Sequence, residues 1–124
     1  MRFESHQIRG RGRATTLGFP TINLEIPKGL NLDYGIYGVN LYLGENKYLG
    51  AMHYGPSPTF KDDLKSCEVY LLDVDEKNPP QTNDKAITID ILKYIRTVRK
   101  FDTPGELIGQ IEKDVEEVKK LSET

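Results

Sequence analysis

The sequence predicts a mainly β protein, a small antiparallel barrel followed by one C-terminal α-helix. Short stretches in which apolar and polar residues alternate are separated by glycine- and proline-rich turns, a pattern typical of antiparallel strands. Near the C-terminus the apolar residues change to helical spacing. With 124 residues and no internal repeat, the chain can bury a single core, and we expect one domain that spans residues 1–124.

The clearest strand is expected at residues 35–43, where Tyr37, Val39 and Leu41 alternate with smaller or more polar residues. A hairpin turn at 44–46 should return the chain antiparallel. The longest strand is expected at 86–99, and its alternation is lost at Leu92, which predicts a bulge or bend of the kind that barrels need. The expected strands are 3–9, one through Thr21 and Asn23, 35–43, 47–54, 67–74 and 86–99.

The helix is expected to begin at Thr103, which forms a capping box with Glu106, and Pro104 occupies the first helical position. A set of apolar residues follows on one face of this helix, and we assign that face to core packing. These residues are Leu107, Ile108, Ile111, Val115, Val118 and Leu121.

Composition excludes several classes of protein. A net charge of −2 argues against a nucleic-acid-binding domain, whose surface would be broadly basic. The single cysteine, Cys67, excludes an intrachain disulfide and fits a reducing compartment. No apolar run reaches the length of a membrane span, and no signal peptide is recognisable at the N-terminus. We therefore expect a cytoplasmic monomer with no membrane or nucleic-acid partner.

The stretch from Leu17 to Leu24 is the first candidate site. Pro20 stiffens the backbone, and Thr21 and Asn23 follow two residues apart, so on a strand their side-chain oxygens share one face. Two neutral hard oxygens suit Mg²⁺, which fills the rest of its coordination shell with phosphate oxygens and water. A surface turn followed by a strand with a solvated threonine and asparagine explains the same residues without a ligand.

A glycine–arginine loop, residues 9–14, precedes this stretch. Its glycines would let backbone N–H groups approach a phosphate, and its arginines would offset the phosphate charge. Neither of the general phosphate-loop patterns, GxxxxGK[ST] and GxGxxG, is present. The loop is therefore a candidate for a small anionic ligand rather than a recognised nucleotide motif.

Glu68 is the candidate general base, because a carboxylate near the start of a strand and close to a proline-rich loop can accept a proton. An ordinary glutamate at the edge of a strand is the more common explanation. His53, on the strand before that loop, is interpreted as a structural hydrogen-bonding residue. Arg96 and Arg99, with the neighbouring Lys100 and Phe101, form a basic–aromatic patch that is ordinarily a solvated strand end.

Together these segments resemble the riboflavin kinase family, which also forms the C-terminal half of bacterial bifunctional FAD synthetases. They follow the order of that family and cover nearly the whole chain, and the Gly-Phe-Pro-Thr-x-Asn signature is specific. The matching segments are the glycine–arginine loop with residues 17–23, then 35–37, 55–60, 68–73, 94–96, 100–101 and, in the helix, Gln110, Ile111 and Asp114.

The resemblance implies a six-stranded antiparallel Greek-key barrel on which ATP and riboflavin meet over one end. The reaction would transfer the γ-phosphate of ATP to the 5′-hydroxyl of riboflavin, giving FMN and ADP. By position, Thr21 and Asn23 match the family's Mg²⁺ ligands, and Glu68 matches its catalytic base. The resemblance assigns ligand binding to Gly10, Gly12, Arg13, Ala14, Pro20, Thr21 and Arg96, with Arg96 in a loop that closes near the flavin.

Two departures leave an alternative open. His53 stands near a position where the family would have an asparagine, and residues 75–85 carry Pro79-Pro80 in place of the family's Leu-Tyr-Gly. The chain is therefore either a riboflavin kinase or a non-catalytic flavin- or nucleotide-binding module on the same barrel. A third hypothesis, that the basic loop binds an acidic partner or RNA, is disfavoured by the negative net charge. FAD synthesis is not expected, because the resemblance covers only the kinase half.

Overall fold

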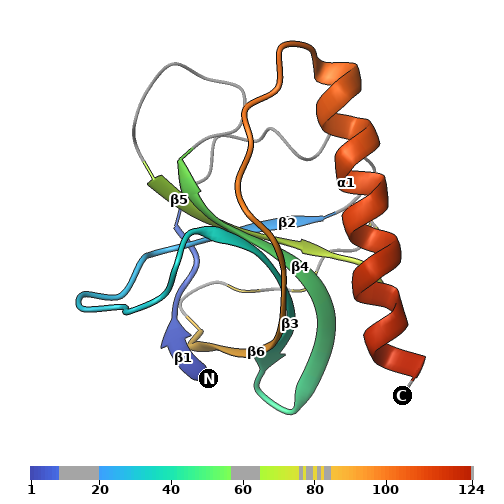
Figure 1. Ribbon diagram of the computed structural model, residues 1–124. Coiled ribbons are helices and arrows are strands. Elements are labelled where there is room, and N and C mark those ends of the chain that lie inside the picture. The colour runs from blue at the N-terminus through green and yellow to red at the C-terminus, as the bar shows by residue number, and fades with distance from the viewer. Residues whose placement is uncertain are drawn as a thin grey trace.

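The structure is a computed structural model that describes residues 1–8, 20–56, 65–75, 77, 80, 82 and 85–123. Within these residues the chain forms one antiparallel sheet, a helix that follows it, and a short 3-10 turn, η2 (Figure 1). The elements are β1 (Arg2–Ser5), β2 (Thr21–Leu24), β3 (Gly35–Leu43), β4 (Asn46–Pro56), β5 (Lys65–Leu71), β6 (Ile87–Arg96), α1 (Pro104–Lys119) and η2 (Lys120–Glu123).

The strand order is β1-β6-β3-β4-β5-β2, and every neighbouring pair is antiparallel. Strands β3, β4 and β5 follow one another as a meander, and β6 returns to pair with β3, which is the Greek-key arrangement. The prediction of a mainly β Greek-key fold with a C-terminal helix is confirmed.

The two edge strands of the sheet, β1 and β2, are joined by the residues that follow β1. Ile8 N donates to Asn23 O at 2.8 Å, Glu25 N donates to His6 O at 3.0 Å, and Gln7 forms an isolated bridge with Leu24. The sheet therefore curls round until its edges meet, and the edge strands do not expose a long row of unpaired backbone groups.

Inward-facing side chains from every strand but β1 build the core, and they alternate with outward-facing residues as the pleat requires. Leu24, Val39, Leu41 and Val69 are fully buried examples, and Phe3 of β1 packs against the cluster. The hairpin between β3 and β4 has a two-residue turn, with Leu43 opposite Asn46 and Gly44 at φ 62°. The turn is thus one residue shorter than predicted.

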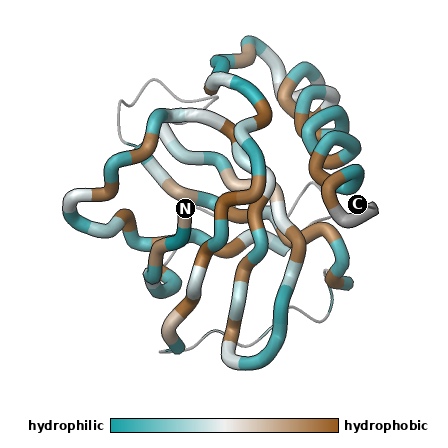
Figure 2. The backbone as a smooth tube through the Cα atoms, turned by 60° about the horizontal axis from the view of Figure 1, so that its bottom comes forward, coloured by the Kyte–Doolittle hydropathy of each residue, from teal (hydrophilic) through white to brown (hydrophobic). Residues whose placement is uncertain are grey.

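Helix α1 lies along the outer face of the sheet (Figure 1). Thr103 caps it as predicted, because its Oγ1 accepts from the backbone N–H of Glu106 at 3.2 Å. Hydrophobic and hydrophilic segments alternate along the helix in Figure 2, as an amphipathic helix requires. The apolar face is buried apart from Leu107 and Leu121, which are half-buried, and Ile108, which is 39% exposed and was wrongly assigned to the core.

Small residues of the sheet let α1 approach closely. A Cβ placed on Gly38 would lie 2.5 Å from Leu121 Cδ1 and 3.5 Å from Val118 Cγ2.

The described part of the chain contains no helix with the length and apolar character of a membrane span.

Four strand predictions need correction. Strand β1 ends at Ser5 rather than at residue 9, and β5 covers Lys65–Leu71 rather than 67–74. The longest strand is β4, with 11 residues, because the ladder to β5 continues through Gly55 to Pro56 and ends there. Strand β6 has ten residues and ends at Arg96, three residues before the predicted end at residue 99. The bulge predicted at Leu92 is confirmed, since Gly38 pairs with Lys93 and Val39 with Ile91, and a second irregularity leaves out Ile95.

Candidate active site

One row of residues crosses five strands at the same level of the sheet. Asn23 of β2 lies opposite Glu68 of β5, Glu68 opposite His53 of β4, His53 opposite Ile36 of β3, and Ile36 opposite Arg96 of β6. Residues directly opposite one another in antiparallel strands project from the same face. This row therefore forms a continuous strip on the outer face of the barrel.

Thr21 lies one step along the same face, opposite Tyr70, and Tyr70 in turn lies opposite Ala51. The residues between them point the other way, since Ile22 and Val69 are buried in the core. The alternation of β2 and β5 thus brings Thr21, Asn23 and Glu68, three residues singled out from the sequence, onto one surface.

These residues differ in their exposure to solvent. Thr21 and Asn23 are half-buried, whereas the carboxyl-bearing Glu68 is only 9% exposed. A nearly buried carboxylate loses hydration and is costly unless neighbouring groups stabilise it. Glu68 therefore combines burial with a position beside two oxygen-bearing side chains, a feature that an ordinary strand-edge glutamate lacks.

The candidate nucleotide-loop residues Gly10, Gly12, Arg13 and Ala14 lie outside the described residues. Both ends of the segment that contains them are nevertheless held near the candidate site. Ile8 N donates to Asn23 O at 2.8 Å, and the carbonyl of Pro20 accepts from Leu71 N at 2.9 Å. Pro20 itself is buried, so the candidate binding residue at this position anchors the backbone next to Thr21.

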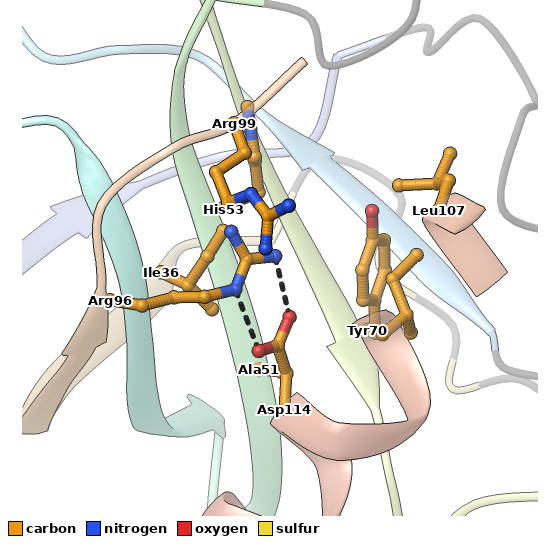
Figure 3. Close-up of a pocket in the computed structure, with 9 residues that line it drawn as sticks. Ile36, Ala51, His53, Tyr70, Arg96, Arg99, Leu107 and Asp114 are labelled. Carbon is orange, nitrogen blue, oxygen red and sulfur yellow. Dashed lines mark hydrogen bonds and ion pairs between the residues drawn. The ribbon is translucent and has the colours of Figure 1, made fainter. Parts of the chain in front are cut away.

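Arg96 is the last residue of β6, and it does not lie in a loop or at a solvated strand end. Its Nε and Nη2 donate to Asp114 Oδ1 and Oδ2 of α1 at 2.8 and 2.7 Å (Figure 3). Its Nη1 donates to Thr97 O at 2.9 Å. The side chains of Arg96 and Asp114 are 18% and 5% exposed. This two-pronged ion pair fixes the end of β6 to the middle of the helix.

The ion pair continues into a short polar network. Gln110 Nε2 donates to Asp114 Oδ1 at 3.1 Å, and Arg99 Nη1 donates to Gln110 Oε1 at 3.2 Å. The network borders a small pocket between α1 and the sheet, with a volume of about 10 Å³, enough for about one water molecule. The residues that line it are Ile36, Ala51, His53, Tyr70, Arg96, Arg99, Leu107, Ile111 and Asp114 (Figure 3).

Sequence reasoning underestimated two residues of this region. Asp114 lies between Ile111 and Val115 on the buried face of α1, so an acidic residue within an apolar stripe was the available signal. His53 is 5% exposed and lies in the same row as Glu68, a position that only the strand pairing reveals.

Cys67, the neighbour of Glu68 in sequence, points into the core and is 2% exposed. Burial, with a smaller contribution from the charge of Glu68, raises the pKa of the Cys67 thiol from 9.0 to about 12. The thiol therefore stays protonated at neutral pH, which excludes Cys67 as a nucleophile.

Among the described residues, no group of three or more histidine, cysteine, aspartate or glutamate side chains could hold a metal ion. A metal here would depend on neutral oxygens, and the oxygens of Thr21 and Asn23 share one half-buried face next to a carboxylate. Such a donor set fits Mg²⁺ that arrives bound to phosphate, because Mg²⁺ takes few protein ligands and keeps several waters.

Known proteins with similar sequences share this domain. The family model Flavokinase, described as riboflavin kinase, matches residues 1–122. A bifunctional riboflavin kinase/FMN adenylyltransferase of Bacillus subtilis (strain 168) is 37% identical over 118 residues, which cover 89% of this chain and 35% of the relative. The RNA-binding riboflavin kinase RibR of the same organism is 34% identical over 117 residues, which cover 94% of this chain and 49% of that protein.

A solved structure of a macrolide-efflux protein from Streptococcus pneumoniae has the same fold, with a TM-score of 0.78 at 24% identity over 95% of this chain and 38% of that one. At this identity the likeness supports the fold alone. The chain spans between about a third and a half of the curated relatives named above. Because the family match covers nearly the whole sequence, this chain belongs to the riboflavin kinase family.

Proposed function

We propose that residues 1–124 form one riboflavin kinase domain, which transfers the γ-phosphate of ATP to the 5′-hydroxyl of riboflavin and releases FMN and ADP. Family membership supports the reaction class, since the family is ATP-dependent and generally uses a divalent metal. The observation that carries the proposal is the pairing of Glu68 with Asn23, with Thr21 on the same face of β2.

Glu68 is proposed as the general base. A primary alcohol is a weak nucleophile, so a positioned carboxylate accepts its proton as the new P–O bond forms. Glu68 is only 9% exposed, so protein groups rather than bulk water surround most of its side chain. Its place on a sheet, rather than on a loop, restricts where the acceptor hydroxyl must lie.

Thr21 and Asn23 would hold Mg²⁺ through their side-chain oxygens. The ion, when bound, would neutralise the developing negative charge on the transferred phosphoryl group. Because both ligands are neutral, the protein alone should bind Mg²⁺ weakly, and the metal is proposed to arrive with ATP. The half-buried position of both side chains leaves room for the nucleotide on the same surface.

We further propose that Gly10, Gly12, Arg13 and Ala14 contact the nucleotide phosphates. The anchoring of Ile8 and Pro20 beside the site supports this assignment, because the segment begins and ends next to the proposed metal ligands. Arg96 is proposed to border the flavin. Its ion pair with Asp114 fixes the plane of the guanidinium, and a fixed planar cation can stack on an aromatic ring.

The physiological setting is proposed as a cytoplasmic monomer that does not bind nucleic acid. The single free cysteine fits a reducing compartment, and the net charge of −2 argues against a nucleic-acid partner. One relative is named an RNA-binding riboflavin kinase. Gel-shift titration with RNA, together with light scattering at several protein concentrations, would test both the RNA and the monomer assignments.

The decisive experiment for the reaction is the formation of FMN from riboflavin by the purified chain. We expect FMN and ADP in equal amounts when ATP and Mg²⁺ are both present, and none when either is omitted. If the chain binds riboflavin or ADP in calorimetry but makes no FMN under any nucleotide or metal, it is a binding module and the proposal is wrong.

A further inference from the structure

We infer that Ile8 is a positioning residue for Asn23: its backbone N–H holds the Asn23 carbonyl and so fixes the direction in which the Asn23 side chain points. The inference rests on the proposed function, in which Asn23 is a ligand of Mg²⁺. The hydrogen bond acts on metal binding rather than on the phosphoryl transfer itself, so it can be tested without turnover.

Strand β2 is hydrogen-bonded to β5 through alternate residues only. Leu71 N of β5 donates to Pro20 O at 2.9 Å. In an antiparallel pair the next residues that exchange backbone hydrogen bonds with β5 are then Ile22 and Leu24, two and four positions further on. Asn23 lies between these two residues, so its own backbone groups point away from β5. Strand β5 therefore does not hold the carbonyl of Asn23.

The chain that follows β1 holds this carbonyl from the other side. Asn23 O accepts from Ile8 N at 2.8 Å, a well-formed hydrogen bond. Glu25 N donates to His6 O at 3.0 Å, so the chain before Ile8 runs antiparallel to β2. Ile8 thus supplies the donor that fixes the peptide group between Asn23 and Leu24.

Side-chain packing does not explain why the segment 6–8 lies here. His6, Gln7 and Ile8 are all exposed, Ile8 to 43%, so the segment buries little apolar surface. The contact of His6 with Glu25 is exposed at both ends, and such a pair contributes little. Backbone hydrogen bonds therefore hold the segment, and one of them ends on a proposed metal ligand.

Metal binding makes the orientation of Asn23 matter. A ligand must be held within about 0.5 Å of its productive position, and Mg²⁺ tolerates little departure from octahedral geometry. The inward side chains of Ile22 and Leu24 fix the place of this four-residue strand in the sheet. They do not fix the rotation of the peptide group after Asn23, which also turns the Cα–Cβ bond of that residue. The N–H of Ile8 restricts this rotation.

A simpler explanation is that the hydrogen bond only helps to close the barrel. Two substitutions at Ile8 and one at Ser5 separate the explanations. Ile8→Pro removes the N–H, whereas Ile8→Ala keeps it and removes the exposed side chain, so the difference between these variants measures the hydrogen bond. Ser5→Ala is the control for closure, because Ser5 Oγ donates to Glu25 O and thus joins the same two segments away from Asn23.

An ester variant serves if proline at position 8 prevents folding. The α-hydroxy acid that corresponds to isoleucine replaces the N–H of Ile8 by an oxygen and keeps the side chain. The full chain with this ester can be assembled by native chemical ligation at Cys67, which is the single cysteine of the sequence. Circular dichroism and thermal unfolding confirm that each variant is folded.

The measured quantity is the factor by which saturating Mg²⁺ tightens the binding of ADP, determined by calorimetry with and without the metal. We expect this factor to be about two- to tenfold smaller in Ile8→Pro, or in the ester variant, than in Ile8→Ala, the range that one backbone hydrogen bond supports. Ser5→Ala should keep the wild-type factor. In an Asn23→Ala background Ile8→Pro should cause little further loss, because the side chain that it positions is gone.

A role in closure alone gives a different pattern. Ile8→Pro and Ser5→Ala would then both lower the free energy of unfolding, the effect of Mg²⁺ on ADP binding would be the same in every variant, and the inference would be wrong. If Mg²⁺ does not tighten ADP binding to the wild type, Asn23 does not hold the metal and the inference falls with that assignment.

The assay for FMN distinguishes these failures from a failure of the proposed reaction. If the wild type makes FMN but Ile8→Pro and Ile8→Ala respond equally to Mg²⁺, the reaction stands and the role of Ile8 is rejected. If the wild type makes no FMN but Ile8→Pro still loses part of the Mg²⁺ effect, the reaction is rejected and the positioning role of Ile8 stands.

Discussion

Asn23 is half-buried on the short strand β2, while the residues on either side of it, Ile22 and Leu24, are buried in the core. Its side chain adds little to packing, so its removal should not open a cavity. The residue is thus well suited to test the metal assignment independently of folding.

Asn23→Ala should lower the rate of FMN formation by on the order of 10²-fold, because a metal held in the wrong place stabilises the transition state poorly. The loss should be largest at limiting Mg²⁺. Asn40→Ala, at a half-buried asparagine of β3 outside the row, is the matched control and should keep wild-type rates. Steady-state assays across a Mg²⁺ titration decide the matter, and unchanged turnover in Asn23→Ala at low Mg²⁺ would remove this residue from the metal site.

Cys67 gives a prediction about stability. Burial raises the pKa of the Cys67 thiol from 9.0 to about 12 in the folded chain. Below pH 9 the thiol is therefore protonated in both the folded and the unfolded chain, and its contribution to the free energy of unfolding is fully present. As the pH rises towards 12, the unfolded chain loses this proton first, and the free energy of unfolding falls by up to about 1.4 kcal/mol per pH unit from this group.

Cys67→Ala should therefore show a shallower loss of stability than the wild type between pH 9 and 12, although its absolute stability is lower because a core atom is missing. Urea denaturation at a series of pH values measures how the free energy of unfolding of each protein changes with pH. If the two proteins lost stability in parallel as the pH rose, the pKa of the folded thiol would not be raised.

At the scale of elements, the alternation of apolar residues was enough to locate most strands and the helix. It could not show which strands pair, because pairing depends on how the whole sheet curls. The row from Asn23 to Arg96 and the neighbour relation of Glu68 and His53 are consequences of that pairing. Strand β4 was predicted too short because Pro56 suggested a loop, yet a proline at the end of a strand costs little.

Helix α1 is held by both apolar contacts and the Arg96–Asp114 pair. Asp114→Asn should destabilise the protein by about 3 kcal/mol, because it leaves the poorly hydrated Arg96 without its counter-charge. The double change Arg96→Met with Asp114→Leu should be less harmful than Asp114→Asn, since no charge is then left unpaired. Chemical denaturation of the three proteins tests this order of stability.

Glu117→Gln provides the control for that comparison. It removes the exposed pair of Glu117 with Lys120, whose atoms are 3.4 Å apart and whose side chains are 49% and 67% exposed, and it should change stability by less than about 0.5 kcal/mol. If Glu117→Gln lost as much stability as Asp114→Asn, any charge change on α1 would be harmful. The effect of Asp114→Asn could then not be assigned to the loss of the buried pair.

At the scale of the whole molecule, the closed sheet supplies a rigid outer surface and α1 covers part of it (Figure 1). Thr21, Asn23 and Glu68 lie on strands whose inner faces are fixed in the core, which restricts their relative positions. The sequence alone singled out these three residues, whereas His53 and Asp114 gained importance only from the assembled fold. The proposed phosphoryl transfer therefore depends on the role of Glu68.

The most direct test is steady-state FMN production by Glu68→Gln, compared with the wild type and with Glu25→Gln, an exposed glutamate outside the row. Glutamine keeps the shape of the side chain but cannot take up the hydroxyl proton, so turnover should fall by about 10²–10⁴-fold. Binding of ADP should be unchanged, and Glu25→Gln should turn over like the wild type. Turnover near the wild-type rate in Glu68→Gln would contradict the account.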